Sequence, residues 1–185
     1  MAADPATSSF GRMTRRLVEH IRTPVYREGY ALVVSAALAS ALGFVYWVVA
    51  ARAYSSEVVG LNSVAISTMV LISGIAQLNL TGALLRFIPV AGRATFRLVG
   101  WSYAASLAAA AVIAPVFLLG VHVWLPKLEF LTADYRFALW FVAATMLWCV
   151  FSLQDSVLTG LRWAIWVPVD NTLFALAKLV LVVAF

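Results

Sequence analysis

Long apolar stretches constrain the fold of this chain more than any other feature of its sequence. Five stretches hold about 20 mostly apolar residues each, the length that a helix needs to cross a bilayer. They exceed the roughly 9–11 residues of a membrane β-strand, and apolar and polar residues do not alternate in them. We therefore expect an all-α, polytopic membrane helix bundle, one domain over residues 30–185, with spans at about 30–51, 58–80, 98–121, 137–158 and 167–185.

The composition excludes an ordinary water-soluble fold. Of the 185 residues, 64% are hydrophobic and 11% are charged, whereas soluble domains have about 45–50% and 25%. The basic residues are too few and too scattered to bind nucleic acid, so the expected partner is the lipid bilayer and no nucleic acid. A single cysteine excludes an intrachain disulfide, and we expect this residue, Cys149, to be a buried structural thiol.

The residues before the first span are polar or basic. Residues 1–9 are small and polar, which is typical of a disordered tail. Residues 10–29 form a basic amphipathic segment, in which one helical face carries the apolar residues Phe10, Met13, Leu17 and Ile21. This pattern favours a helix on the membrane surface, and a solvated basic tail is the alternative. The first span, from Tyr30, is too long for a signal peptide, so we expect it to stay in the protein.

Basic residues outside the spans predict the orientation of the chain. Nine of them lie on the side of the N-terminus: Arg12, Arg15, Arg16, Arg22, Arg27, Arg86, Arg93, Arg97 and Arg162. Three lie on the other side: Arg52, Lys127 and Arg136. Because cytoplasmic connections carry an excess of lysine and arginine, this distribution predicts a cytoplasmic N-terminus.

The sequence shows no arrangement that is typical of an enzyme. It contains two histidines and one cysteine, and it lacks the HExxH, CxxC, GxSxG and P-loop motifs. We therefore expect no catalytic residues, no metal site and no cofactor.

Three polar residues of the second expected span fall on one helical face. Asn62, Ser73 and Gln77 lie within about 60° of one another at 100° per residue. Polar groups in hydrocarbon are costly, so they usually face a partner helix or a water-filled cavity. The stripe therefore lines a cavity or supplies hydrogen bonds between packed helices, and the sequence leaves both interpretations open.

Three charged residues at or inside the spans are candidates for a functional site. Arg86 follows the second span, where its planar guanidinium is suited to bind a phosphate or to anchor the helix end on lipid. Asp155 is a candidate ion site or the partner of Arg162 in an ion pair. Lys178 lies inside the fifth span, where it faces a cavity, pairs with an acid or extends toward the interface.

Several short motifs lie at the ends of the expected spans. The first span leads into Ala51-Arg52 and a short loop that ends in Glu57-Val-Val-Gly60. The second stretch reads Leu80-Thr-Gly-Ala-Leu-Leu-Arg-Phe-Ile-Pro89, and Leu158-Thr-Gly-Leu-Arg162 before a span with Lys178 is similar as well. Together these stretches resemble polysaccharide flippases of the multidrug/oligosaccharidyl-lipid/polysaccharide exporter superfamily, and the likeness covers about residues 27–182. One departure is Ser55-Ser56, where family members often have a proline.

The resemblance implies a transporter of lipid-linked oligosaccharide, such as O-antigen units, that works by alternating access in the bacterial inner membrane. Arg86 would attract the pyrophosphate of the lipid carrier, polar residues of the second span and Lys178 would line the substrate path, and Asp155 would couple transport to an ion gradient. Family members have two related halves around the substrate cavity. The chain is therefore similar to the N-terminal portion of a longer transporter, and the remaining half is an implied partner.

Two alternatives belong to other classes of function. The chain is also interpretable as a small, non-transporting membrane protein that scaffolds or regulates envelope polysaccharide enzymes through its helices. Within the same superfamily, the drug-exporting branch is the other candidate. The Arg86-Phe-Ile-Pro89 sequence and the basic N-terminal segment favour the polysaccharide branch.

Overall fold

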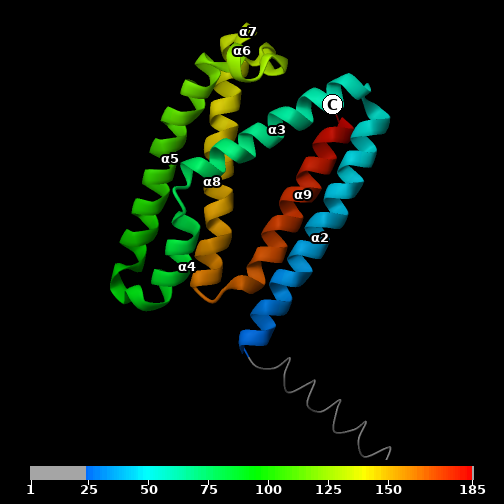
Figure 1. The fold of residues 1–185 in the computed structure, drawn as a ribbon. Helices are drawn as coiled ribbons and strands as arrows, with labels where there is room; N and C mark the ends of the chain where they lie inside the picture. The colour runs from blue at the N-terminus through cyan, green and yellow to red at the C-terminus, as the bar shows by residue number, and fades with distance from the viewer. Residues whose placement is uncertain (1–23, 185) are drawn as a thin grey trace, which may run out of the picture.

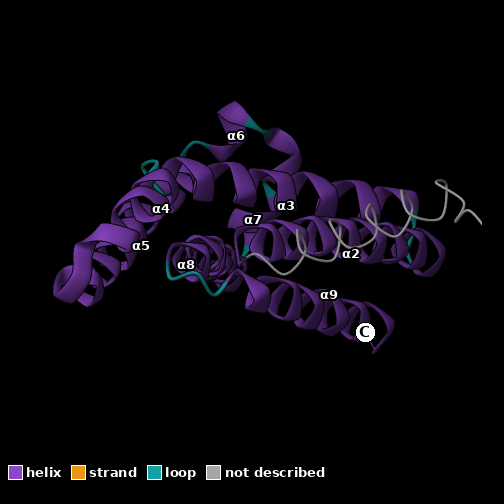
Figure 2. Cartoon of the chain, turned by 90° about the horizontal axis from the view of Figure 1, so that it is seen from below, coloured by secondary structure: helices purple, strands orange, loops and turns teal. Residues whose placement is uncertain are grey.

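A computed structural model describes residues 24–184, and all regular structure in that range is helical (Figures 1 and 2). The long helices are α2 (Pro24–Ala53), α3 (Ser56–Ala76), α4 (Leu80–Ala91), α5 (Thr95–Leu119), α8 (Tyr135–Gly160) and α9 (Val167–Ala184). The short ones are η1 (Gly92–Ala94), α6 (Val121–Trp124), η2 (Pro126–Leu128), α7 (Phe130–Ala133) and η3 (Ala164–Trp166). The expected all-α fold is confirmed. The predicted tail at 1–9 and most of the amphipathic segment at 10–29 lie outside the described residues.

Five helical segments are long and apolar enough to cross a membrane: Leu32–Ala53, Ser56–Ala76, Leu80–Leu119, Tyr135–Gly160 and Ala164–Val183. Large side chains on them face outward; Phe44, Leu147 and Val183 are 71%, 67% and 72% exposed. Apolar surface of this extent is stable only against lipid or another apolar partner. By the length and composition of its helices, the chain is a multi-pass membrane protein.

The long helices form two groups (Figure 1). Helices α2 and α9, from opposite ends of the described chain, pack side by side along their length. Helices α3, α4 and α5 pack on α8 instead. The two groups touch mainly around η3, where the chain passes from α8 to α9. This arrangement leaves space between the groups farther along α9.

Small residues hold the second group together. The buried face of α5 consists of four small residues at intervals of four, followed by Leu118: Ser102, Ser106, Ala110 and Ala114. They allow α5 to approach α8 closely, as small residues commonly do between membrane helices. Cys149 of α8 is fully buried with Ala76 and Ala110, which confirms that its thiol is buried.

The second and third crossings differ from the expected ones. Instead of one span at 58–80 and a connection up to residue 98, α3 ends at Ala76 and a separate helix, α4, follows the break. The break contains Leu78 and Asn79, both left-handed with φ of 51° and 58°. Helix α4 forms because Leu84 and Ile88, one turn apart, bury one face against Leu153 of α8. The third span, expected at 98–121, is α5 and begins earlier, at Thr95.

The basic ends predicted to share one side of the membrane lie at the same end of the structure. Figure 1 places the start of α2, the turn from α4 to α5 and the connection from α8 to α9 at one end. The α4–α5 turn carries Arg93, and Arg162 follows α8. The connections with Arg52 and Lys127 lie at the opposite end. We call the first the arginine-rich end and the second the opposite end.

Candidate functional site

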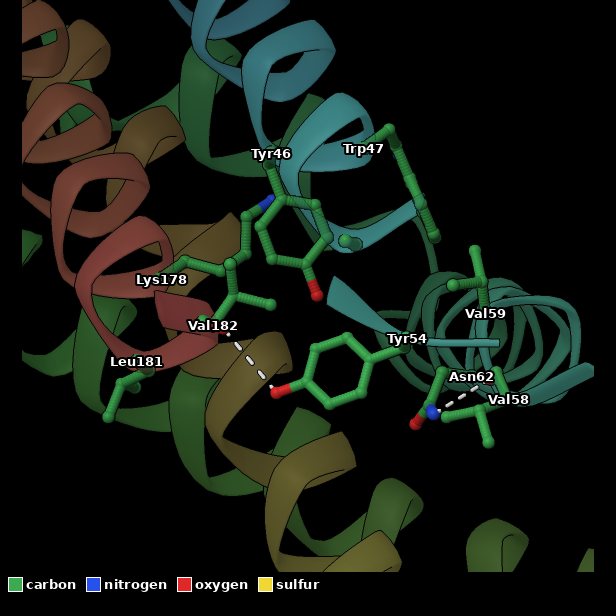
Figure 3. A pocket seen from close by; sticks show the side chains of 10 residues that line it. Tyr46, Trp47, Tyr54, Val58, Val59, Asn62, Lys178, Leu181 and Val182 are labelled. Atoms are coloured by element: carbon green, nitrogen blue, oxygen red, sulfur yellow. Dashed lines mark hydrogen bonds between the residues drawn. The ribbon is translucent and has the colours of Figure 1, made fainter. Parts of the chain in front are cut away.

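A cavity with a lysine in its wall lies between α2, α3 and α9 (Figure 3). It has a volume of about 450 Å³ and is lined by Tyr46, Trp47, Ala50, Tyr54, Val58, Val59, Asn62, Lys178, Leu181 and Val182. The Lys178 ammonium lies over the Tyr46 ring, 4.2 Å from its centroid. Such a contact offsets part of the cost of placing an ammonium away from water. We call this space the lysine cavity.

The lysine cavity is polar toward the opposite end of the structure. The Tyr54 hydroxyl, just beyond α2, donates a hydrogen bond to the carbonyl oxygen of Val182 at 3.4 Å and ties the ends of α2 and α9 together. Asn62 of α3 donates from Nδ2 to the Val58 carbonyl at 2.9 Å (Figure 3). Its Oδ1 has no hydrogen-bond partner among the described residues and faces an exposed surface.

A second, apolar cavity begins where the lysine cavity ends. It has a volume of about 590 Å³, and its walls come from α2, α3, α8 and α9. Tyr46, Trp47 and Lys178 line both cavities. Its far end contains Gln154. We call this space the aromatic groove, because it runs between the two helix groups and is lined largely by rings.

Three aromatic side chains form a cluster in the wall of the aromatic groove. The ring centroids of Trp148 and Phe151 on α8 are 5.6 Å apart, and Phe174 of α9 lies 5.7 Å and 4.7 Å from them. These separations are typical of favourable aromatic pairs. The cluster connects α8 to α9 through contacts between aromatic rings, so this wall of the groove is apolar.

Polar residues connect the two helix groups near the arginine-rich end. Asn171 of α9 donates from Nδ2 to Asp155 Oδ2 of α8 at 3.2 Å and to the Ser35 hydroxyl of α2 at 3.3 Å. The residue before each of Asp155 and Asn171 makes a parallel contact, in which Gln154 Nε2 donates to Asp170 Oδ2 at 2.8 Å. We call these five residues the polar junction. It joins α8 to the closely packed α2–α9 pair, on which α8 otherwise packs little.

Asp155 is the unusual member of the polar junction. Its Oδ1 atom is buried and has no hydrogen-bond partner among residues 24–184. Within that range no Lys or Arg forms an ion pair with it, so the predicted Asp155–Arg162 pair is not present, and Arg162 is exposed after α8. A buried acceptor without a donor favours either a proton on that oxygen or a bound cation.

The predicted stripe on the second span separates into three environments. Ser73 is fully buried, and its hydroxyl lies 2.7 Å from the Met69 carbonyl oxygen and 3.2 Å from that of Thr145 on α8. Gln77 caps the end of α3 and accepts a hydrogen bond from Thr81 at 3.1 Å. Asn62 alone reaches a cavity. For Ser73 the structure therefore favours the packing interpretation, and for Asn62 it favours cavity lining.

Arg86 lies apart from both cavities. It is exposed on α4, and its guanidinium lies 5.6 Å from the centroid of the Phe87 ring. The structure does not bring it near Lys178 or the polar junction. Its role in phosphate binding stays a prediction.

Sequence reasoning missed Ser35, Tyr46 and Asn171 as parts of these sites. Asn171 was visible as a polar residue at the start of a span, but its partners lie 16 and 136 residues away. Among the described residues, no group of three His, Cys, Asp or Glu side chains is arranged to hold a metal ion. Comparisons with protein-family models, curated proteins and solved structures give no match to this chain.

Proposed function

We propose that the chain acts in a membrane transporter that moves an amphipathic, anionic substrate, in the manner of lipid-linked oligosaccharide flippases. The observation that carries the proposal is Lys178: it lies inside an apolar helix, borders two cavities and has no carboxylate partner among the described residues. An ionisable residue inside the membrane usually marks a substrate or ion path. The resemblance in the sequence supplies the oligosaccharide-lipid class of substrate.

The arrangement of the helices supports alternating access. The α2–α9 pair contacts the α8 group through the polar junction and the aromatic cluster, and the aromatic groove separates the groups between Lys178 and Gln154. A change in the angle between the two groups would widen or close that groove without breaking the tight α5–α8 packing. Helix groups that rock against one another around a site are a common mechanism in transporters.

Asp155 is the proposed coupling residue. In the carboxylate form, Oδ2 accepts from Asn171 and Oδ1 is left without a donor. A proton taken up on Oδ1 would remove the buried charge and weaken the hold of Asp155 on Asn171. The proton would leave again as Oδ1 becomes accessible from the other side. Protonation therefore changes the contact that joins α8 to α9 and α2.

Export in cells tests the proposal. The gene in its native length is deleted in its source organism and replaced by variants, and lipid-linked oligosaccharide is measured on each face of the membrane. Lys178→Gln and Arg86→Ala are expected to lower export at least tenfold at unchanged membrane levels. Lys127→Gln, an exposed lysine in the connection after α6, is the matched control. Normal export in the deletion strain would refute the transport proposal and favour the scaffold alternative.

A second arm separates the two branches of the superfamily. If the deletion strain keeps normal oligosaccharide export but becomes sensitive to cationic drugs, the drug-exporting branch is the correct assignment. A lysine without an acidic partner at the cavity disfavours a cationic substrate, because like charges repel in a low-dielectric site. The structure's charge therefore supports the anionic substrate.

A further inference from the structure

The lysine cavity and the aromatic groove together have the shape and charge of a binding site for a single lipid molecule. We propose that they hold one anionic glycerophospholipid from the surrounding bilayer, with its phosphate at Lys178 and one acyl chain along the groove. This inference does not rest on transport, because a bilayer lipid would occupy the site whenever no substrate is bound there.

The charge of the site selects the headgroup. Lys178 is the one Lys or Arg side chain in the walls of these two cavities, and no Asp or Glu lines either of them. Its ammonium lies over the face of Tyr46 and forms no hydrogen bond or ion pair within residues 24–184, so its three donors can bind a phosphate oxygen. Tyr54 and Asn62 add polar atoms on the side toward the opposite end, where a headgroup would lie. The site therefore prefers a net negative headgroup over a zwitterionic one.

The length of the groove indicates which kind of lipid chain it can hold. The apolar path runs from Lys178 to Gln154, which is hydrogen-bonded to Asp170 on α9. Eight residues separate Asp170 from Lys178 on one helix, so the path is about 12 Å long at 1.5 Å per residue. One leaflet of a bilayer is about 15 Å thick in its hydrocarbon part. An acyl chain of a bilayer lipid is of comparable length to this path.

The walls of the groove suit an acyl chain. Rings of Trp148, Phe151 and Phe174 and the side chains of Ile66 and Met69 supply apolar contacts from three helices, α3, α8 and α9. The groove volume of about 590 Å³ lies within the range of about 300–1,000 Å³ that is usual for ligand sites. Trp140 and Leu147 on its rim are 70% and 67% exposed, so the groove opens toward the surrounding lipid.

The proposal is tested with spin-labelled lipids. The protein in its native length is reconstituted in phosphatidylcholine vesicles that contain a trace of spin-labelled phosphatidylglycerol or phosphatidylcholine. Electron paramagnetic resonance then gives the motionally restricted fraction of each. We expect a several-fold preference for phosphatidylglycerol that Lys178→Gln abolishes and Lys127→Gln leaves unchanged.

A second variant tests the chain-binding part of the site. Ala144→Trp fills the groove from α8, and it is expected to remove one restricted lipid per protein for either headgroup. Ala105→Trp adds the same ring on the exposed face of α5 and is expected to remove none. A wild-type protein without headgroup preference overturns the proposal. So does an Ala144→Trp variant with unchanged lipid number, which would mean that protein rather than lipid fills the groove. Neither result depends on export, so the proposed function is judged separately.

Discussion

The contact between α4 and α8 gives the sharpest test of the broken second crossing. Gly160, the last residue of α8, lies directly against Ile88 of α4. A Cβ atom added at Gly160 would lie 3.0, 3.1 and 3.2 Å from Cβ, Cδ1 and Cγ2 of Ile88. Separations this short are rare between carbon atoms, whose optimum is about 3.5–4.0 Å. Gly160→Ala therefore forces α4 away from α8 or strains Ile88.

The expected loss of stability in Gly160→Ala is judged against the same substitution at a matched position, Gly100. No atom lies within 4 Å of a Cβ added there, on the exposed face of α5. Both substitutions gain helix propensity of up to about 1 kcal/mol, so their difference isolates the steric cost. Overpacking typically costs about 1–3 kcal/mol, and one kcal/mol shifts the melting midpoint by about 2–4 °C in a protein of this size. We expect Gly160→Ala to melt about 2–12 °C below Gly100→Ala.

The single cysteine provides the assay. Cys149 is fully buried between α3, α5 and α8 and becomes accessible to a thiol-reactive dye only when those helices separate. Dye fluorescence against temperature in detergent then gives the midpoint for each variant. In an Ile88→Ala background, where Cδ1 and Cγ2 are absent, Gly160→Ala is expected to lower the melting midpoint by less than it does in the wild type. Equal midpoints for Gly160→Ala and Gly100→Ala would refute the α4–α8 contact and with it the position of α4.

The remaining predictions use the same dye assay, two of them together with export. Leu78→Gly is expected to raise the melting midpoint, whereas Leu78→Ala is not, because a left-handed residue that carries a Cβ costs about 1–2 kcal/mol. The Leu78 side chain is 62% exposed, so its loss removes little packing. Equal midpoints for the two variants would contradict a strained break between α3 and α4. Ser73→Ala removes a helix–helix hydrogen bond worth about 0.6 kcal/mol and should lower the midpoint by about 1–2 °C without changing export; a large loss of export would assign Ser73 to the substrate path. Asp155→Asn removes a buried charge at constant shape, so the midpoint should rise while export falls at least tenfold; unchanged export would remove Asp155 from the coupling role.

Hydropathy was sufficient to predict the helical fold because lipid leaves the backbone few alternatives. The ends of α5, α8 and α9 fall within a few residues of the expected spans, whereas α2 begins at Pro24, before the expected start at Tyr30 and inside the predicted amphipathic segment. Burial of Cys149 was predictable for the same reason, since its neighbours in the sequence are apolar on every side. The distribution of arginines also anticipated which helix ends lie together.

Helix α4 was not predictable from the same signals. Arg86 in its middle and Pro89 near its end are typical of a connection, and twelve residues are too short for a span. The helix exists because Leu84 and Ile88 bury against α8, which is a tertiary contact. Asn79 was the one local signal, since asparagine tolerates the left-handed conformation that ends α3. The predicted polar stripe therefore included Gln77, which lies just beyond the last residue of α3.

The polar junction was beyond sequence reasoning for a different reason. Its members come from α2, α8 and α9, and Ser35 meets Asn171 across 136 residues. Nothing in the order of the spans indicates that the first packs on the fifth. Each polar residue could be recognised alone as costly in hydrocarbon, but its partner could not be named. The lysine cavity has the same origin, because Tyr46 and Lys178 also join α2 to α9.

The separation of Lys178 from Asp155 argues for function at both ends of the groove. The least costly arrangement for a lysine and an aspartate inside a membrane is an ion pair. Asp170, which belongs to the polar junction with Asp155, is eight residues before Lys178 on α9, and that distance of about 12 Å excludes direct pairing. The fold thus retains two costly groups, each stabilised by weaker neighbours: a tyrosine ring for the ammonium and an asparagine amide for the carboxylate. Because the two groups are kept apart, the Lys178 ammonium stays available to an anion and the Asp155 carboxylate to a proton, as the proposed function requires.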